Sequence, residues 1–186
     1  MNSSTGVDKP TRPESADSTR KGTALNVLAV LLAAIALGAA FMVPWTLGPR
    51  TLVARESHGG TAAISTSCTH YVGAEVTISV PGRGTIVVSA TVGVGINHTF
   101  GVNDEARISV AASDAECGIT DYTAFVSVPA PLARDSSYYE TVPLLRPFAV
   151  SGAGEYTFYV NGVMAQGADA NDRFDSASLV ATYHPA

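Results

Sequence analysis

The residues best suited to chemistry lie in a short acidic segment near the end of the chain: Asp169, Asn171, Asp172 and Asp175. Closely spaced carboxylate and amide oxygens are the ligands that calcium prefers in proteins, so this segment is a candidate calcium site. It lacks the glycine and the terminal glutamate of an EF-hand loop. An acidic turn, whose side chains bond their own backbone, is the favoured interpretation. We predict no other cofactor.

Histidine chemistry is the second possibility. The spacing of the four histidines matches no zinc-binding pattern: His58, His70, His98 and His184. His98 and Asp104 could act as a base and its orienting acid for a nucleophilic serine, but the chain contains no Gly-x-Ser-x-Gly elbow. We therefore predict that the chain is not an enzyme.

Cys68 and Cys117 are the only two cysteines of the chain. An even pair in an exported domain most simply forms a disulfide, and two buried free thiols are the alternative. A bridge that closes a loop of about 49 residues would stabilise the fold by about 4 kcal/mol in the chain-entropy model.

Composition limits the class of protein. The 186 residues are 46% hydrophobic and only 15% charged, with a mean hydropathy of +0.21. The length allows one domain and an anchor, which excludes a polytopic transporter. After residue 49 the chain has seven arginines, no lysine and thirteen acidic residues. No basic stripe is present, so we predict that nucleic acid is not a partner.

An uncharged segment of 28 residues lies between Lys21 and Arg50. A helix over residues 24–47 would be about 36 Å long, enough to cross a bilayer core of about 30 Å. We predict a transmembrane helix over residues 23–48, a signal anchor whose partner is the lipid bilayer. The Ser, Thr and Pro content of residues 1–22 predicts a disordered tail before it.

The orientation of this anchor follows from the flanking charge. Arg20 and Lys21 stand directly before it, which favours an N-terminus in the cytoplasm and a C-terminal domain outside it. The predicted location is the cell membrane, as a single-pass protein. Cleavage after the small residues Gly38, Ala39 and Ala40 is the alternative, and the domain would then be secreted.

The part of the chain after the anchor alternates between apolar and polar residues. Residues 49–67 are rich in Gly, Ser, Thr and Ala and predict a flexible stalk. Residues 68–186 predict a β-sandwich domain, because strict alternation buries one face of a strand. The expected strands cover residues 75–80, 85–96, 106–111, 122–128, 138–150, 155–164 and 176–184.

Three details refine these strands. Pro143 and Pro147 cannot donate to a ladder, which places their strand at a sheet edge or at a bulge. Asn161-Gly162 is a hairpin signal, but the alternation continues through it, so we favour one long strand with a kink. Tyr138 and Tyr139 beside Arg134 are candidates for an exposed contact patch, with half-buried strand aromatics as the alternative.

The pattern predicts an all-β, antiparallel two-sheet sandwich of jelly-roll type, with an immunoglobulin-like sandwich as the alternative. It resembles the C1q and tumour-necrosis-factor-like jelly rolls in three segments: VPGRGTIVVSATV, GEYTFYV and SLVATYH. That resemblance implies a homotrimer and recognition of a protein or glycan ligand by surface loops. The chain is also similar to exported bacterial β-domains that have no assigned function.

The sequence supports three hypotheses about function. The favoured one is a membrane-anchored extracytoplasmic β-sandwich that acts as a binding or structural module. A carbohydrate-active or hydrolytic enzyme on the same fold is the first alternative. An accessory single-pass subunit of a larger membrane complex is the second, because small residues such as Ala33, Ala34, Gly38 and Ala39 permit close helix packing.

Overall fold

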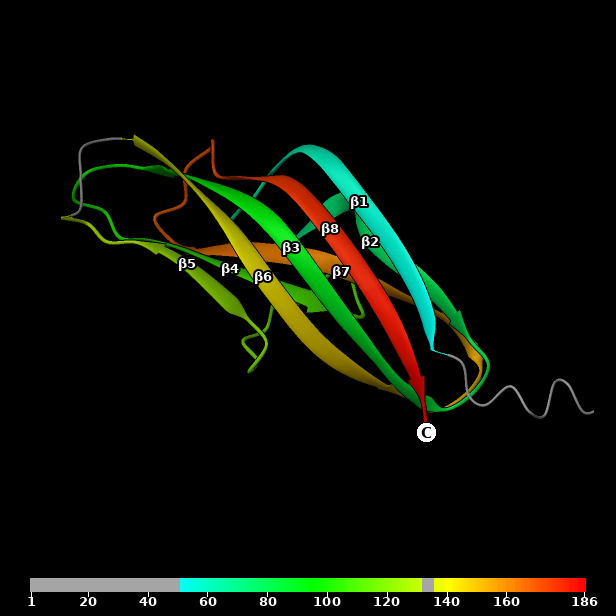
Figure 1. Cartoon of the computed structure of the whole chain (residues 1–186). Helices are drawn as coiled ribbons and strands as arrows, with labels where there is room; N and C mark the ends of the chain where they lie inside the picture. Colours follow the sequence, from blue (N-terminus) through cyan, green and yellow to red (C-terminus); the bar gives the residue numbers. More distant parts are fainter. Residues whose placement is uncertain (1–50, 132–135) are drawn as a thin grey trace, which may run out of the picture. The chain divides into compact units, whose positions relative to one another are not determined.

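A computed structural model of the chain describes residues 51–131 and 136–186 (Figure 1). The chain divides into two units, residues 1–48 and residues 49–186. The predicted tail (1–22) and transmembrane helix (23–48) lie outside the described residues. Within the two described ranges, none of the secondary structure is a helix with the length and apolarity that a membrane crossing needs.

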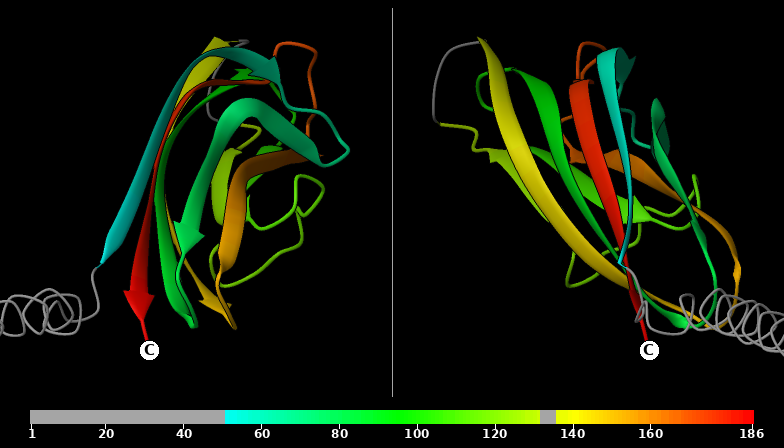
Figure 2. Two further views of the ribbon diagram at one scale, coloured as in Figure 1. Left: turned by 90° about the vertical axis from the view of Figure 1, so that its right-hand side faces the viewer. Right: turned by 45° about the vertical axis from the view of Figure 1, so that its right-hand side comes forward.

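Eight antiparallel strands make up the described part of the chain (Figures 1 and 2). They are β1 (Leu52–Ala63), β2 (Thr69–Val80), β3 (Gly84–His98), β4 (Asp104–Ala111), β5 (Ala124–Val128), β6 (Ser136–Val150), β7 (Gly154–Gln166) and β8 (Arg173–Pro185). They form two four-stranded sheets with the orders β1-β8-β3-β6 and β2-β7-β4-β5. The predicted all-β, antiparallel two-sheet sandwich is confirmed.

The strand pairing is nested. β1 pairs with β8, β2 with β7, β3 with β6 and β4 with β5. Two sheets joined in this nested way have the strand order of a jelly roll rather than that of an immunoglobulin domain.

The core lies between the sheets and uses the apolar face of each strand. In β3, alternate residues are buried: Ile86, Val88, Ala90, Val92, Val94 and Ile96. Aromatic side chains from the other strands fill the centre of the sandwich. Tyr71 of β2 stacks on Phe174 of β8, with ring centroids 4.7 Å apart. The alternation seen in the sequence therefore marks the core-facing side of the sheets, as expected.

The predicted stalk at residues 49–67 is wrong over most of its length. Leu52–Ala63 form β1, an edge strand that pairs with β8 and has a register shift between Gly59 and Ala62. Small residues are typical of flexible linkers, but here Leu52 and Ala54 pack against the core and the backbone pairs with β8. The folded domain therefore begins near residue 51 and not at residue 68.

Two detailed predictions are confirmed. β6, which contains both Pro143 and Pro147, is an edge strand. β7 continues through Asn161-Gly162 as one strand. The reason for glycine at 162 is a close approach between the sheets, because a Cβ there would lie 2.6 Å from Cζ of Phe174.

Candidate functional site

The four predicted calcium ligands lie at one end of the sandwich. Asp169, Asn171 and Asp172 are in the loop between β7 and β8, and Asp175 is in β8. The backbone N–H of Asn97 donates to Oδ1 of Asp172 at 2.8 Å, and that of Asp169 donates to Oδ2 at 2.6 Å. Asp172 thus fastens its loop to the end of β3 through Oδ1 and closes the loop on itself through Oδ2.

The other acidic side chains of the loop are also engaged. Oδ1 of Asp169 accepts the backbone N–H of Asn171 at 2.8 Å, and Oδ1 of Asp175 accepts Nε–H of Arg173 at 3.0 Å. Across residues 51–131 and 136–186, no group of three or more His, Cys, Asp or Glu side chains is arranged to hold a metal ion. In these hydrogen bonds the acidic side chains accept N–H groups of their own loop and of β3, as the side chains of an acidic turn do.

Burial makes the carboxyl group of Asp172 a weaker acid than usual. Its side chain is buried, and the loss of hydration raises its pKa above the ordinary value of about 3.8. The N–H groups of Asp169 and Asn97 oppose this by stabilising the carboxylate. The nearby charges of Asp169 and Asp104 act in the same direction as burial and raise the pKa further.

His98 and Asp104, the predicted base and orienting acid, do meet. Nδ1–H of His98 donates to Oδ2 of Asp104, and both side chains are almost fully buried. Nε2 of His98 and Oδ1 of Asp104 have no hydrogen-bond partner among the described residues. The pair is therefore buried, and no described serine hydroxyl bonds to Nε2.

The backbone at position 167 passes so close to Asp104 that only glycine fits there. Its φ of +65° suits glycine, and a Cβ there would lie 2.0 Å from Oδ1 of Asp104. A cavity of about 440 Å³ lies next to the pair, between the ends of β4, β5 and β7. It is lined by Asn103, Asp104, Glu105, Ser127, Val128, Pro129 and Gln166.

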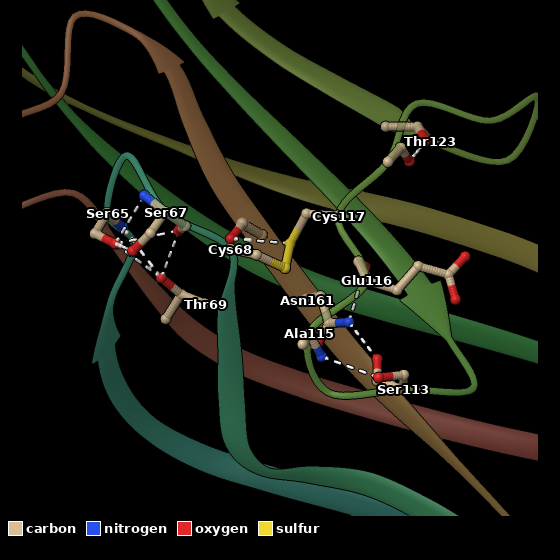
Figure 3. The surroundings of a disulfide bond; sticks show 12 residues. Ser65, Ser67, Cys68, Thr69, Ser113, Ala115, Glu116, Cys117, Thr123 and Asn161 are labelled. Atoms are coloured by element: carbon tan, nitrogen blue, oxygen red, sulfur yellow. Dashed lines mark hydrogen bonds between the residues drawn. A yellow bond between two sulfur atoms is a disulfide. The ribbon is translucent and has the colours of Figure 1, made fainter.

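The predicted disulfide between Cys68 and Cys117 is present (Figure 3). It joins the turn between β1 and β2 to the loop at residues 112–123, which connects β4 and β5. Close to the bridge, the hydroxyl groups of Ser65, Ser67 and Thr69 bond to one another and order the turn that carries Cys68. We call residues 112–123 the clamped loop.

Two further side chains hold the clamped loop, and sequence reasoning missed both. The buried amide of Asn161 donates to the carbonyl oxygens of Ser113 at 2.7 Å and Glu116 at 2.9 Å (Figure 3). Arg146 of β6 donates to the carbonyl oxygen of Val110 at 2.8 Å and to Oε1 of Glu116 at 3.1 Å. The sequence around Asn161 indicates only a hairpin turn or a kinked strand, and its contact with the loop is not predictable because the partners lie more than 40 residues away in the chain.

The clamped loop presents apolar side chains to solvent. Ile119 and Tyr122 are 61% and 43% exposed, and Leu145 of β6, which lines the same shallow cavity as Tyr122, is 60% exposed. A shallow cavity of about 200 Å³ lies between the loop and β6. It is lined by Asp121, Tyr122, Thr123, Ala124, Pro143, Leu144 and Leu145.

The two tyrosines of the predicted contact patch differ in exposure. Tyr139 is 62% exposed, and its ring and hydroxyl contact the guanidinium of Arg173. Tyr138 is half-buried, with its ring edge against His98. Arg134, the third member of the predicted patch, lies outside the described residues.

The remaining histidines are dispersed. His58 contacts the ring of Tyr71, His70 contacts Tyr159 and lies 3.5 Å from Glu75, and His184 is exposed on β8. They do not converge on one site.

Comparison with known proteins gives no functional assignment. No family model matches the chain, and no curated protein matches it. Solved structures of the infectious bursal disease virus Gx strain and of the infectious bursal disease virus VP2 subviral particle align with 73% and 74% of the chain, at 15% and 17% identity and TM-scores of 0.34 and 0.32. The chain spans about one third of the length of each. The assignment of the fold therefore rests on the strand pairing of this chain.

Proposed function

We propose that the chain is a membrane-anchored, extracytoplasmic β-sandwich that acts as a binding or structural module. The observation that carries this proposal is the clamped loop. A disulfide, a buried amide and an arginine fix this loop from three different strands or turns. Loops held on a rigid scaffold are the usual place for recognition.

The disulfide also supports the proposed location. Stable disulfides belong to oxidising compartments outside the cytoplasm. The uncharged segment of 28 residues before Arg50 has the length of a transmembrane anchor. Together these features favour a domain that is exported and held at the membrane by residues 23–48.

The exposed side chains favour recognition of another molecule by the clamped loop. Ile119 and Tyr122 project from a segment that is already ordered, so binding would cost little further conformational entropy. Tyrosine and other large apolar side chains are enriched in the buried centre of interfaces. We propose a protein or glycan ligand at this surface, as the C1q-like resemblance implies.

Topology in cells tests the location. An epitope tag placed after Ala186 should react with antibody on intact cells or spheroplasts, and a tag before Met1 should react only after permeabilisation. The domain should migrate differently with and without reductant, because the bridge forms outside the cytoplasm. Accessibility of the N-terminal tag alone, or recovery of the whole chain in the soluble cytoplasmic fraction, would contradict the proposal.

The oligomeric state tests the second part of the proposal. The full chain in detergent should have the mass of a trimer by light scattering coupled to size exclusion, once the detergent is subtracted. A monomer would contradict the trimer that the resemblance implies. The proposed membrane anchor is tested separately, by the topology experiment.

A further inference from the structure

The clamped loop ends in a turn that displays two side chains. In residues 120–123, the backbone N–H of Thr123 donates to the carbonyl oxygen of Thr120 at 3.1 Å, and that of Thr120 donates to Oγ1 of Thr123 at 2.9 Å. Asp121 and Tyr122 are the two central residues of this turn, and both are exposed. Hydrogen bonds of the two threonines therefore hold a carboxylate and an aromatic ring at adjacent positions on the surface.

Strand β6 forms the other wall of the shallow cavity of about 200 Å³ beside this turn. Pro143, Leu144 and Leu145 line that wall, and Leu145 is 60% exposed. Arg146, the next residue of β6, donates to Oε1 of Glu116 and so ties the clamped loop to this strand. Cavities that hold drug-sized molecules measure about 300–1,000 Å³. This smaller cavity suits a single side chain of a partner.

The clamped loop has an excess of negative charge. Its acidic residues are Asp114, Glu116 and Asp121, and it contains no basic residue. Arg146 neutralises Glu116, with its guanidinium 3.1 Å from Oε1. Asp114 and Asp121 form no ion pair within the part of the chain that the structure describes. Two carboxylates of the loop thus remain without a neutralising charge there.

The strands around the loop do not supply a free basic group. Strands β2, β4, β5, β6 and β7 contain one histidine and two arginines, and each lies within 3.5 Å of a carboxylate: His70, Arg107 and Arg146. The same strands hold Glu140 and Glu155, which form no ion pair among the described residues. The surroundings of the loop are therefore negative even after every ion pair is counted.

A basic side chain of another protein matches this arrangement. The aliphatic part of an arginine or lysine would lie between the ring of Tyr122 and Leu145, and its charged head would reach the carboxylate of Asp121. A cation that contacts both a tyrosine ring and a carboxylate is stabilised by each of them. An acidic segment would be repelled by the same surface.

We infer that the clamped loop binds a protein segment in which an arginine or lysine stands next to a large apolar residue. The basic side chain occupies the cavity at Asp121, and the apolar one packs on Ile119, which is 61% exposed in the same loop. This inference rests on the proposed recognition by the clamped loop. It specifies a protein ligand rather than a glycan, because four of the seven residues that line the cavity are apolar and give sugar hydroxyls few side-chain partners.

A peptide display library tests this specificity. The full chain, kept in mild detergent and held by a tag after Ala186, is screened against phage that display random peptides. Phage that bind the tagged surface alone are removed first. We expect the enriched peptides to contain arginine or lysine beside an aromatic or aliphatic residue, and we expect the enrichment to fall when D121N replaces the wild type.

A double-mutant cycle tests the contact at Asp121. Fluorescence anisotropy measures the Kd of the most enriched peptide and of an analogue with glutamine in place of its basic residue. D121N should weaken binding of the first peptide about fivefold, as for an ion pair that stays partly exposed, and should leave binding of the second unchanged. E155Q is the control, because it removes one negative charge about 20 Å along β7 from Asn161, and it should affect neither peptide.

Two variants of Tyr122 test the wall of the cavity. Y122A should weaken binding about thirtyfold, the loss expected for an aromatic residue at the centre of an interface. Y122F keeps the ring and should bind within about twofold of the wild type. Circular dichroism should show that all the variants are folded, because the substituted side chains are exposed.

The outcomes separate this inference from the proposed function. Enriched peptides without a basic residue, or equal binding to D121N and the wild type, overturn the inference. A screen without enriched peptides overturns it too. In that case, binding to an array of neutral oligosaccharides that Y122A abolishes would leave the proposed binding module standing with a glycan ligand. Absence of both kinds of binding would also overturn recognition by the clamped loop.

Discussion

Asp172 is a single buried carboxylate that organises a whole loop. It accepts N–H groups from Asn97 and Asp169, which belong to separate segments of the chain, and so it joins the β7–β8 loop to β3. A calcium ion would join the same segments in a site of the kind the sequence suggested. Backbone N–H groups are the partners of Asp172 in the structure, and burial raises the pKa of its carboxyl group.

This raised pKa predicts a particular dependence of stability on pH. The folded chain binds the Asp172 proton more tightly than the unfolded chain, so it holds more protons between pH 4 and the raised pKa. The free energy of unfolding therefore falls as the pH rises through that window. Urea unfolding of the wild type and of D172N, measured at a series of pH values, should show the wild type losing stability relative to D172N as the pH rises.

D172N provides the reference because its side chain at position 172 does not titrate. Asn cannot accept both N–H groups as the carboxylate does, and that cost is independent of pH over the window. A difference between the two proteins that grows in favour of the wild type with rising pH would show that the pKa is lowered, and would contradict the effect of burial.

Gly162 gives a second prediction at the level of one residue. In G162A the new methyl group would meet the ring of Phe174 at 2.6 Å and the side chain of Ile108 at 3.0 Å. Overpacking of this kind costs about 1–3 kcal/mol. The free energy of unfolding should fall by that amount in denaturant titrations monitored by circular dichroism.

G118A is the matched control for G162A. A Cβ at Gly118 meets no atom within 4 Å, so the substitution should change the free energy of unfolding by less than about 1 kcal/mol. If G162A were as stable as G118A, the two sheets would not approach each other as closely at β7 as the structure describes.

Among the elements, seven strands were predictable and one was not. β3 is evident in the sequence because branched apolar residues alternate with small or polar ones over its whole length. β1 is concealed because its small residues, Gly59 and Gly60 among them, mimic a linker, and because a register shift breaks its alternation. Its pairing depends on β8, more than 100 residues later, which local sequence cannot reveal.

Some residues of the candidate site could be predicted from the sequence, and others could not. Cysteine chemistry alone suggested the bridge between Cys68 and Cys117. The contributions of Asn161 and Arg146 to the clamped loop depend on which strands lie side by side, so they emerge only from the fold. His98 and Asp104 were paired correctly in the sequence, but their burial was not foreseen.

Removal of the disulfide tests how far it supports these elements. The double variant C68S/C117S should lose about 4 kcal/mol of unfolding free energy, since a closed loop of about 49 residues restricts the unfolded chain. Guanidinium titrations of the double variant and of the reduced wild type should agree. Equal stability of the oxidised and reduced wild-type protein would contradict this expectation.

At the scale of the whole molecule, the first and last strands are neighbours. β1 lies at the edge of its sheet and covers one side of β8, so residues near position 52 complete a ladder that ends near position 183. Because of the nested pairing, β1 is held in place by β8. The N-terminal boundary of the domain therefore cannot be found without knowing where the last strand lies.

Two fragments of the chain test this boundary. Residues 51–186 should fold into a β-rich domain that unfolds cooperatively. Residues 64–186 lack β1, which exposes the edge of β8 and removes the packing of Leu52, Ala54 and Ala62. Their free energy of unfolding should be lower by about 2–4 kcal/mol, and they should associate through the exposed edge.

Thermal and denaturant unfolding followed by circular dichroism, with light scattering for association, distinguish the fragments. Both retain Cys68 and Cys117, so the bridge does not account for a difference between them. Identical midpoints would mean that residues 52–63 are a stalk after all. A helical spectrum for either fragment would contradict the fold.

The start of β1 and the end of β8 lie at the same end of the sandwich, and this determines how the domain resists mechanical force. Force applied between residues 52 and 185 would peel β1 from β8 and break their hydrogen bonds one after another. Force applied between residues 52 and 173 runs along the two strands, and it loads all the bonds of that ladder together, because they lie across the strands. The domain is therefore weak in the first direction of pulling and strong in the second.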